Sequence, residues 1–230
     1  MSIDIMVIGA HPDDVEIGMG GTIAAFSQAG YKVLILDLSD GEPTPAGTHE
    51  KRMIEAKNAA EILKVEKRIT LDLVNREIMD TVENRKKVAT VMRQYKPTLL
   101  FIPYWDDGHP DHVEAAKLCT SARFYSKFVK SEMAFEPHFP EKIYHYLTLH
   151  MRLRVDPSVI FDISNLIETK INALNAYASQ FIDNKKNTAA FESVRTENAY
   201  WGKQIRVAYG EPFICKENIK MSSPDRFLDA

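Results

Sequence analysis

The first half of the chain alternates short apolar runs with amphipathic stretches. The apolar runs predict buried strands at residues 3–9, 32–38, 68–73 and 98–102. Apolar positions at helical spacing between them predict helices at residues 22–29, 48–63, 81–95 and 111–124, with Thr48 and Thr81 as N-caps of the second and third. Strands that alternate with helices form parallel sheets through right-handed crossovers, and continuously apolar strands need cover on both faces. The pattern therefore predicts an α/β fold with a Rossmann-like, mostly parallel sheet and helices on both faces.

The usual strand order of such a half-sheet, 3-2-1-4, brings the first and fourth strands together at the switch point, where ligands bind. A polar cluster follows each of these strands: residues 11–14 after the first and residues 109–112 after the fourth. The order therefore predicts that the two clusters meet at one edge of the sheet.

The second half of the chain has a less regular pattern. Residues 142–147 and 159–162 are expected to add C-terminal strands, and Ser164 is expected to cap a helix that runs to residue 180. A polar loop at 183–190, a helix at 194–207 and a loosely ordered tail after Glu217 complete the expected elements. No repeat or low-complexity linker interrupts the chain, so residues 1–230 are expected to form a single domain.

The composition is that of a soluble globular protein, with 45% hydrophobic and 27% charged residues in 230 positions. A net charge of −3 gives no basic excess, which argues against nucleic acid and anionic membranes as partners. The first apolar run is too short for a signal peptide or a membrane span. Cys119 and Cys215 lie far apart and are expected to be reduced thiols of a cytoplasmic protein.

The two polar clusters have the residue types of a catalytic metal site. His11 and Asp14 are three positions apart, so one turn can present both to an ion, and His112 would supply a third ligand from the other cluster. Catalytic zinc usually has three protein ligands and keeps one position for water. These residues are therefore expected to bind Zn²⁺, and Fe²⁺ or another divalent ion also suits the mixed nitrogen and oxygen ligands.

Three residues beside the expected ligands offer further chemistry. Asp13 is expected to act as the general base, because a bound metal lowers the pKa of its water to roughly 7 and a carboxylate can complete the deprotonation. His109 would stabilise an oxyanion or protonate a departing amine. Asp111 would orient His109 or a ligand imidazole, or else cap the helix that begins there.

A glycine-rich run at residues 18–21 offers a different interpretation, dinucleotide binding. The run lacks the fingerprint spacing and lies too far beyond the first strand. We therefore expect these glycines to allow close packing where a helix begins.

With these clusters, the sequence resembles the PIG-L/LmbE-like zinc deacetylases, which remove N-acetyl groups from glucosamine-containing molecules. Residues 10–22, 109–112, 41–42 and 47–56 carry this resemblance, while 162–164 and 176–181 resemble the bacillithiol-pathway branch, which deacetylates N-acetylglucosaminyl malate. The resemblance implies zinc on His11, Asp14 and His112, with Asp13 as base and His109 as its electrostatic or acid partner. It also implies a homo-oligomer.

The resemblance adds a substrate contact and shows two departures. Arg52 matches an arginine that family members turn toward the substrate; its alternative is a solvated helix position paired with Glu55. Gly108 replaces the arginine usual in the bacillithiol branch, and residues 74–76 read Val-Asn-Arg where that branch has Pro-Asp-Arg. A missing arginine weakens the case for a carboxylate-bearing aglycone such as malate.

The sequence thus predicts a zinc-dependent N-deacetylase that acts on an N-acetylglucosamine unit of a small glycoconjugate. Tyr104 and Trp105, just before the second cluster, would line the sugar pocket or serve only in packing. Two alternatives remain open: a metal-dependent amidase that cleaves another N-acyl conjugate, and a non-catalytic Rossmann-type nucleotide-binding module.

Overall fold

The computed structural model of the protein describes residues 2–148, 150–151, 153–187 and 189–220. Its strands form one sheet in the order β3-β2-β1-β4-β5-β7-β6. Their bounds are β1 Ile5–Gly9, β2 Val33–Ser39, β3 Lys67–Leu73, β4 Leu99–Pro103, β5 Lys142–Tyr146, β6 Val159–Asp162 and β7 Gly210–Ile214. The first five strands pair in parallel, whereas β7 runs antiparallel to both β5 and β6. The predicted order 3-2-1-4 and the mostly parallel sheet are confirmed.

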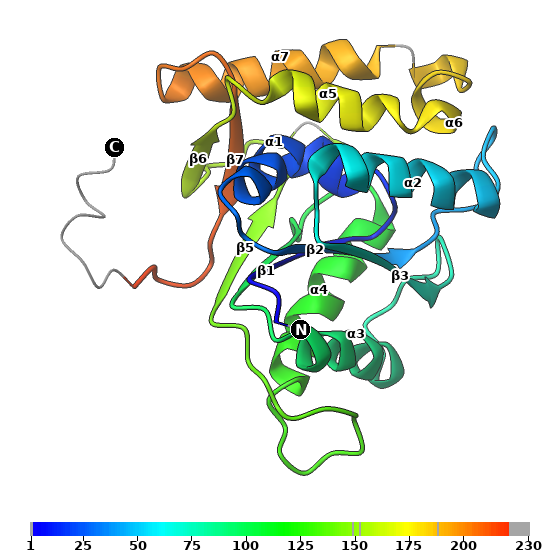
Figure 1. Cartoon of the computed structure of the whole chain (residues 1–230), viewed down its shortest axis with the longest axis vertical. Helices are drawn as coiled ribbons and strands as arrows, with labels where there is room; N and C mark the ends of the chain where they lie inside the picture. The colour runs from blue at the N-terminus through cyan, green and yellow to red at the C-terminus, as the bar shows by residue number, and fades with distance from the viewer. Residues whose placement is uncertain (1, 149, 152, 188, 221–230) are drawn as a thin grey trace.

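Helices cover both faces of the sheet (Figure 1). Their bounds are α1 Asp14–Gln28, α2 His49–Leu63, α3 Val82–Tyr95, α4 Pro110–Tyr125, α5 Ile167–Asn175, α6 Ala178–Phe181 and α7 Ala190–Gln204, with a short 3-10 turn η1 at Lys185–Asn187. Figure 1 shows α1 and α2 on one face, α3 and α4 on the other, and α5 to α7 as an outer layer over α1 and α2. Two groups of buried apolar residues, one on each face, hold these layers together. This cover explains why β1 and the first four residues of β2 are apolar.

The first helix begins earlier than the sequence predicted, at Asp14 in place of residue 22. The glycines lie on both sides of a kink in α1 at Met19, whose φ of −152° and ψ of 26° are not helical, and neighbouring residues approach the backbone closely there. A Cβ on Gly18 would lie 2.3 Å from the Tyr146 ring, and one on Gly21 would lie 2.7 Å from Ile163. The expected close packing is confirmed, and the consequence is that Asp14 stands in the first turn of a helix directly after β1.

Two predicted caps are confirmed and two are wrong. Thr48 and Thr81 accept hydrogen bonds from the backbone at the starts of α2 and α3. Ser164 instead accepts from the backbone N–H of residues 208 and 209, and α5 starts after Leu166. The start of α4 is capped by the His109 ring, which frees the Asp111 side chain for other contacts.

The C-terminal region departs most from the sequence prediction. The helix expected over 164–180 is broken into α5 and α6 at Tyr177, whose buried hydroxyl donates to Glu16 Oε1 at 3.0 Å. The last helix starts at Ala190, four residues before the prediction. The pattern of the chain did not predict β7, because its Gly-Glu-Pro start is unusual for a strand. Most of the predicted tail lies outside the described residues.

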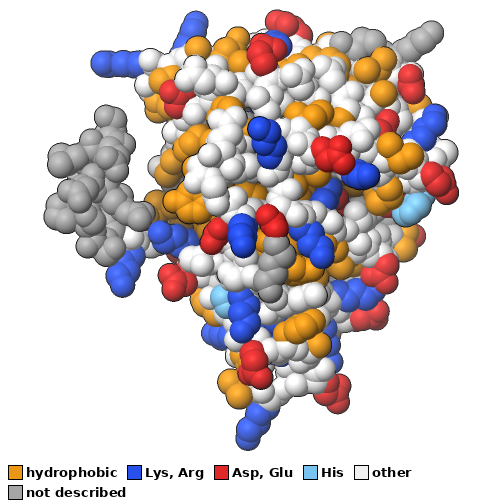
Figure 2. Space-filling view, viewed as in Figure 1, with side chains coloured by type: hydrophobic (Ala, Val, Ile, Leu, Met, Phe, Trp, Pro, Cys, Tyr) orange, Lys and Arg blue, Asp and Glu red, His pale blue; other side chains and the backbone are white. Residues whose placement is uncertain are grey.

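On the face viewed in Figure 1, basic and acidic side chains are interspersed (Figure 2), in keeping with the small net charge. Among the described residues, no helix is long and apolar enough to cross a membrane.

Candidate metal centre and active-site pocket

The two polar clusters meet at the carboxyl ends of β1 and β4, which are neighbours in the sheet. His11 and Asp14 follow β1, and His112 lies in the first turn of α4. All three are at least nine-tenths buried. The ligand atoms of the three side chains lie within 4.8 Å of one another, and the two imidazole centroids are 5.5 Å apart. The fold therefore brings together the three side chains that the sequence predicted as ligands.

The hydrogen bonds leave one nitrogen of each imidazole facing this cluster. His112 Nδ1 binds Asp107 Oδ2 at 2.8 Å, while its buried Nε2 has no hydrogen-bond partner among the described residues and lies 3.2 Å from Asp14 Oδ1. His11 Nε2 binds Asp111 Oδ2 at 3.0 Å, and its Nδ1 lies 3.5 Å from Asp14 Oδ2. Imidazoles held from behind by carboxylates are typical of metal ligands. The orphaned Nε2 of His112 and the adjacent carboxylate thus suit a divalent cation.

The electrostatics of the cluster favour positive charge. Burial lowers the pKa of His11, but hydrogen bonds to Asp111 and Asp14 outweigh it and raise the pKa to about 9. Burial likewise lowers the pKa of His112, while the charge of Asp14 and the bond to Asp107 raise it to about 10. The pKa of Asp14 falls well below its usual value because its two histidine neighbours overcome the effect of burial. A cation, whether protons or a metal ion, is what this geometry stabilises.

Asp13 lies beside the cluster in a strained backbone conformation. Its φ of 106° is in the left-handed region, which a non-glycine residue rarely adopts. Burial raises its pKa to about 7, and the charge of Arg52 partly opposes that rise. Arg52 Nη2 binds Asp13 Oδ2 at 3.0 Å and the carbonyl oxygen of Pro12 at 2.5 Å. These contacts fix the carboxylate at the mouth of the cluster with a pKa near neutrality.

Arg52 is not the solvated helix residue of the alternative interpretation. Its side chain is buried in α2, and Glu55 accepts from Ser179 instead. Arg52 Nε and Nη1 have no hydrogen-bond partner among the described residues, and the side chain lines the pocket. Both of these atoms are buried, and Nη1 lies 4.0 Å from Glu42 Oε1, so the guanidinium acts on the pocket through the Asp13 carboxylate that it holds.

The ring of His109 lies over the other imidazoles, 4.8 Å from His112 and 4.9 Å from His11 between centroids. Its Nδ1 accepts the N–H of Asp111 at 3.2 Å, so a neutral ring carries its proton on Nε2. Burial, together with the charges of His112 and His11, lowers its pKa to about 4. His109 is thus a neutral hydrogen-bond donor at neutral pH.

The side chain of Asp111 contacts the imidazole of His11, an expected ligand, and does not contact His109. Besides His11, its Oδ2 accepts the backbone N–H of Arg76 at 2.7 Å. Of the two orienting roles considered from sequence, the geometry corresponds to that of a partner for His11.

Sequence reasoning missed Asp107 and His150. Asp107 Oδ1 accepts the N–H of both His109 and His150, while Oδ2 holds His112. The only signal was a carboxylate five positions before a predicted ligand. His150 comes from a distant segment, and its ring lies 4.9 Å from His112. No local pattern connects it to the site.

Tyr104 and Trp105 lie away from the pocket. Their ring centroids lie 4.2 Å apart with the planes tilted by 38°, and Trp105 packs against His145 and under Lys216. Neither residue lines the pocket that contains the histidine cluster. The geometry corresponds to the packing alternative for both.

The pocket has a volume of about 260 Å³ and opens above the cluster. Its lining comes from several parts of the chain: His11, Asp13, Asp14, Ile17, Gly41, Thr44, Arg52, Asn75, Arg76, His109, His112, His150, Gln180, Phe181 and Asn187. Gly108, the departure noted above, packs on the backbone of His150, where a Cβ would lie 3.3 Å from the carbonyl oxygen.

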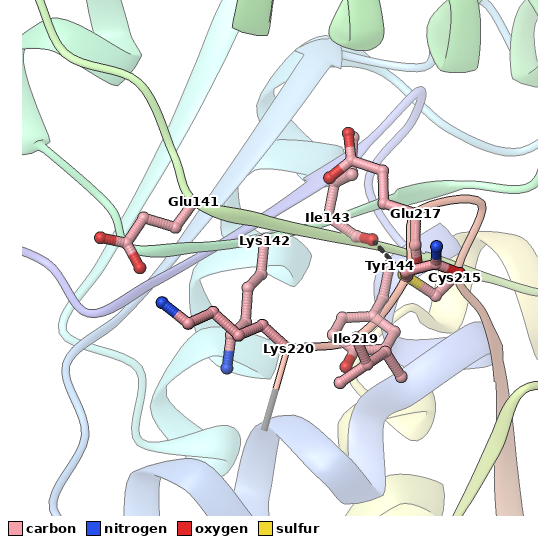
Figure 3. Close-up of a pocket in the computed structure, with 9 residues that line it drawn as sticks. Glu141, Lys142, Ile143, Tyr144, Cys215, Glu217, Ile219 and Lys220 are labelled. Carbon is pink, nitrogen blue, oxygen red and sulfur yellow. Dashed lines mark hydrogen bonds between the residues drawn. The ribbon is translucent and has the colours of Figure 1, made fainter. Parts of the chain in front are cut away.

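A second hollow, beside β5 and the segment after β7, contains none of the predicted site residues (Figure 3). In it, the Cys215 thiol donates to the carbonyl oxygen of Ile143 at 3.4 Å. The histidine pocket is therefore the candidate active site.

Replacing Asp107 by alanine is expected to weaken metal binding by about 10–100-fold, because His112 loses the carboxylate that orients its ring. Metal affinity measured by competition with a chromophoric chelator checks this, with the exposed neighbour Asp106→Ala as the matched control. Unchanged affinity in the Asp107 variant would show that packing alone orients His112.

The chain is similar to known proteins in sequence and in fold. Residues 6–123, about half of the chain, match the PIG-L family, described as GlcNAc-PI de-N-acetylase. The chain is 34% identical over 224 residues to diacetylchitobiose deacetylase of Thermococcus kodakarensis, covering 90% of this chain and 80% of that protein.

Two solved structures resemble the chain over most of its length. The conserved protein TT1542 of Thermus thermophilus has a TM-score of 0.88 and 33% identity, with 96% of this chain and 97% of that one covered. The N,N'-diacetylchitobiose deacetylase of Pyrococcus horikoshii, complexed with its inhibitor MPG, has a TM-score of 0.80 and 28% identity, with 91% and 82% covered. The chain therefore belongs to the PIG-L family.

Proposed function

We propose that the protein is a zinc-dependent N-deacetylase that removes the acetyl group from an N-acetylglucosamine unit of a small glycoconjugate, releasing acetate and a free amine. One observation carries the proposal. His11, Asp14 and His112 converge in a pocket that is also lined by Asp13, a carboxylate with a pKa near 7. The deacetylase names of the family and of its relatives support the same reaction.

His11, Asp14 and His112 would hold the metal ion. When bound, such an ion lowers the pKa of water and polarises a carbonyl. Fe²⁺ would also suit these ligands. Asp111 and Asp107 hold the ligand imidazoles in the required orientation from behind.

Asp13 is the proposed general base. It takes a proton from the attacking water and returns it to the nitrogen as the C–N bond breaks. Arg52 holds the carboxylate in place through Nη2. His109 donates from Nε2 to the oxyanion that develops on the acetyl oxygen, a role that suits a neutral ring better than acid catalysis.

The names of the relatives point to sugar amides of small size. Diacetylchitobiose deacetylase acts on a short glucosamine-containing molecule, and we propose a substrate of that class for this chain. Membership of the bacillithiol branch stays a prediction, because Gly108 stands where that branch usually has the arginine that would bind a malate carboxylate. We also propose one catalytic domain over residues 1–230 and assembly into a homo-oligomer.

The direct test is acetate release from a panel of N-acetylglucosaminides by the zinc-loaded protein. We expect turnover with at least one of them and none after the metal is removed by a chelator. Faster release of a larger acid from other N-acyl conjugates would favour the amidase alternative. A protein that binds no divalent ion after reloading would favour the nucleotide-binding module.

The pH dependence of kcat/KM tests the role of Arg52. Asp13 must be ionised to act as base, so activity should rise with pH through the pKa of its carboxyl group. The Arg52 charge lowers that pKa. The variant Arg52→Gln is therefore expected to move the acidic limb to higher pH. A limb that stays in place would show that another group limits the reaction.

A further inference from the structure

Three amide side chains line the active-site pocket: Asn75, which follows β3, Gln180 in α6, and Asn187 in η1. Two of them donate to backbone carbonyls. Asn75 Nδ2 binds the oxygen of Gly41 at 2.7 Å, and Asn187 Nδ2 binds the oxygen of Gln180 at 2.9 Å. A carbonyl oxygen only accepts, so these contacts fix which end of each amide faces the protein.

The orientation of Gln180 is fixed by a relay of hydroxyls and carboxylates. Its Nε2 donates to Thr44 Oγ1 at 3.0 Å and to Ser179 Oγ at 2.8 Å. Each hydroxyl has one proton, and each donates it to a carboxylate: Thr44 to Glu42 Oε1 at 2.9 Å, and Ser179 to Glu55 Oε2 at 2.7 Å. Both hydroxyls must therefore accept from Gln180, and its carbonyl oxygen turns away from them.

The three side-chain oxygens that remain are Asn75 Oδ1, Gln180 Oε1 and Asn187 Oδ1. In residues 2–148, 150–151, 153–187 and 189–220, no group donates a hydrogen bond to any of them. None belongs to the fully buried atoms that lack a partner, and all three residues line the pocket. The pocket thus presents three acceptors whose orientation the protein has set in advance. We call Asn75, Gln180 and Asn187 the amide wall.

We propose that the amide wall is a specificity determinant that reads hydroxyl groups of the substrate as hydrogen-bond donors, an inference that rests on the proposed deacetylase function. A hydroxyl satisfies a fixed acceptor, whereas a carboxylate brings only further acceptors and is repelled. A site built to bind a hydroxyl rejects the analogue that lacks it, because its polar group is then left unpaired. The wall therefore favours a neutral, hydroxyl-rich group over an anionic aglycone.

The pocket also has a cation that could favour an anion, Arg76. Its Nη2 donates to the carbonyl oxygen of Pro43 at 2.8 Å, and its backbone N–H binds Asp111. Because Arg76 could attract an anion, the test includes a substrate with a carboxylate-bearing aglycone beside a neutral one.

The experiment is a cycle between wall residues and substrate hydroxyls. The 3-, 4- and 6-deoxy analogues of one active N-acetylglucosaminide are compared with the parent in wild type, Asn75→Ala and Asn187→Ala. In wild type we expect roughly a 5–150-fold loss of kcat/KM for the analogue whose hydroxyl is read. A variant without the amide that binds this hydroxyl should lose a similar factor of kcat/KM on the parent substrate. On the deoxy analogue, its kcat/KM should fall little further. Asn184→Ala, close in sequence but outside the pocket lining, should keep the wild-type ratio.

If the loss of kcat/KM from the residue change and the loss from the missing hydroxyl multiply in every variant, the proposal is overturned, because a merely structural role gives that result. A higher kcat/KM for a carboxylate-bearing aglycone than for a neutral one would overturn it as well. The same cycle measured as Kd by calorimetry needs no turnover. Binding with the expected non-additivity but without acetate release would refute the proposed function and leave the amide wall supported.

Discussion

Replacing Asp13 by alanine is expected to lower kcat by about 10²–10⁴-fold while the protein still binds its metal ion. The carboxylate lies beside the ligands but is not one of the three that converge, and burial keeps its pKa near 7, where a base works well at neutral pH. Acetate release and metal content measured on the same preparation check both parts of the expectation.

The matched control for this variant is Asp106→Ala, which removes an exposed carboxylate outside the pocket lining. A second variant, Asp13→Gly, should show the same loss of activity. It should fold at least as stably as the wild type, because glycine adopts the left-handed backbone conformation of residue 13 without strain. Near-normal turnover in Asp13→Ala would exclude this residue as the base.

Replacing His112 by alanine is expected to abolish stoichiometric metal binding and to lower kcat/KM by at least about 10²-fold. The expectation follows from geometry, since His112 Nε2 is buried, has no hydrogen-bond partner among the described residues and lies beside Asp14. Loss of a carboxylate behind a ligand already costs roughly 10–100-fold in affinity, and loss of the ligand should cost more. Metal content after dialysis, with affinity measured by chelator competition, gives the readout.

His49→Ala is the matched control, because His49 is exposed, pairs only with Asp40 among the described residues and lies outside the pocket lining. A thermal melt of each variant separates loss of the metal from loss of the fold. Full metal occupancy in His112→Ala would contradict the proposed ligand set.

The sequence determined most of the sheet and the place of the site. Its apolar runs marked the strands, because strands covered on both faces are apolar along most of their length. Their alternation with helices left few topologies, and the neighbouring ends of β1 and β4 then held His11 and His112 close together. The residue types predicted the ligands and the base, and the family resemblance implied the same roles and added Arg52 as a substrate contact.

Elements shaped by long-range packing escaped the sequence analysis. The glycines of α1 argued against a helix, yet Tyr146 and Ile163 need the space that they leave. The break between α5 and α6 depends on the contact of Tyr177 with Glu16, which lies at the other end of the chain. Neither contact can be inferred from the helix propensity of the local sequence.

The chain by itself therefore determined the fold class, the family and the residue types that gather at one edge of the sheet, since these follow from periodicity and from short motifs. Only the tertiary structure decided how these groups are oriented. It assigned Asp111 to His11 and Asp107 to His112, set a neutral His109 over the cluster, and brought Gln180 and Asn187 into the pocket. The physical reason is that hydrogen-bond direction and burial depend on partners from distant segments, which come together only when the chain has folded.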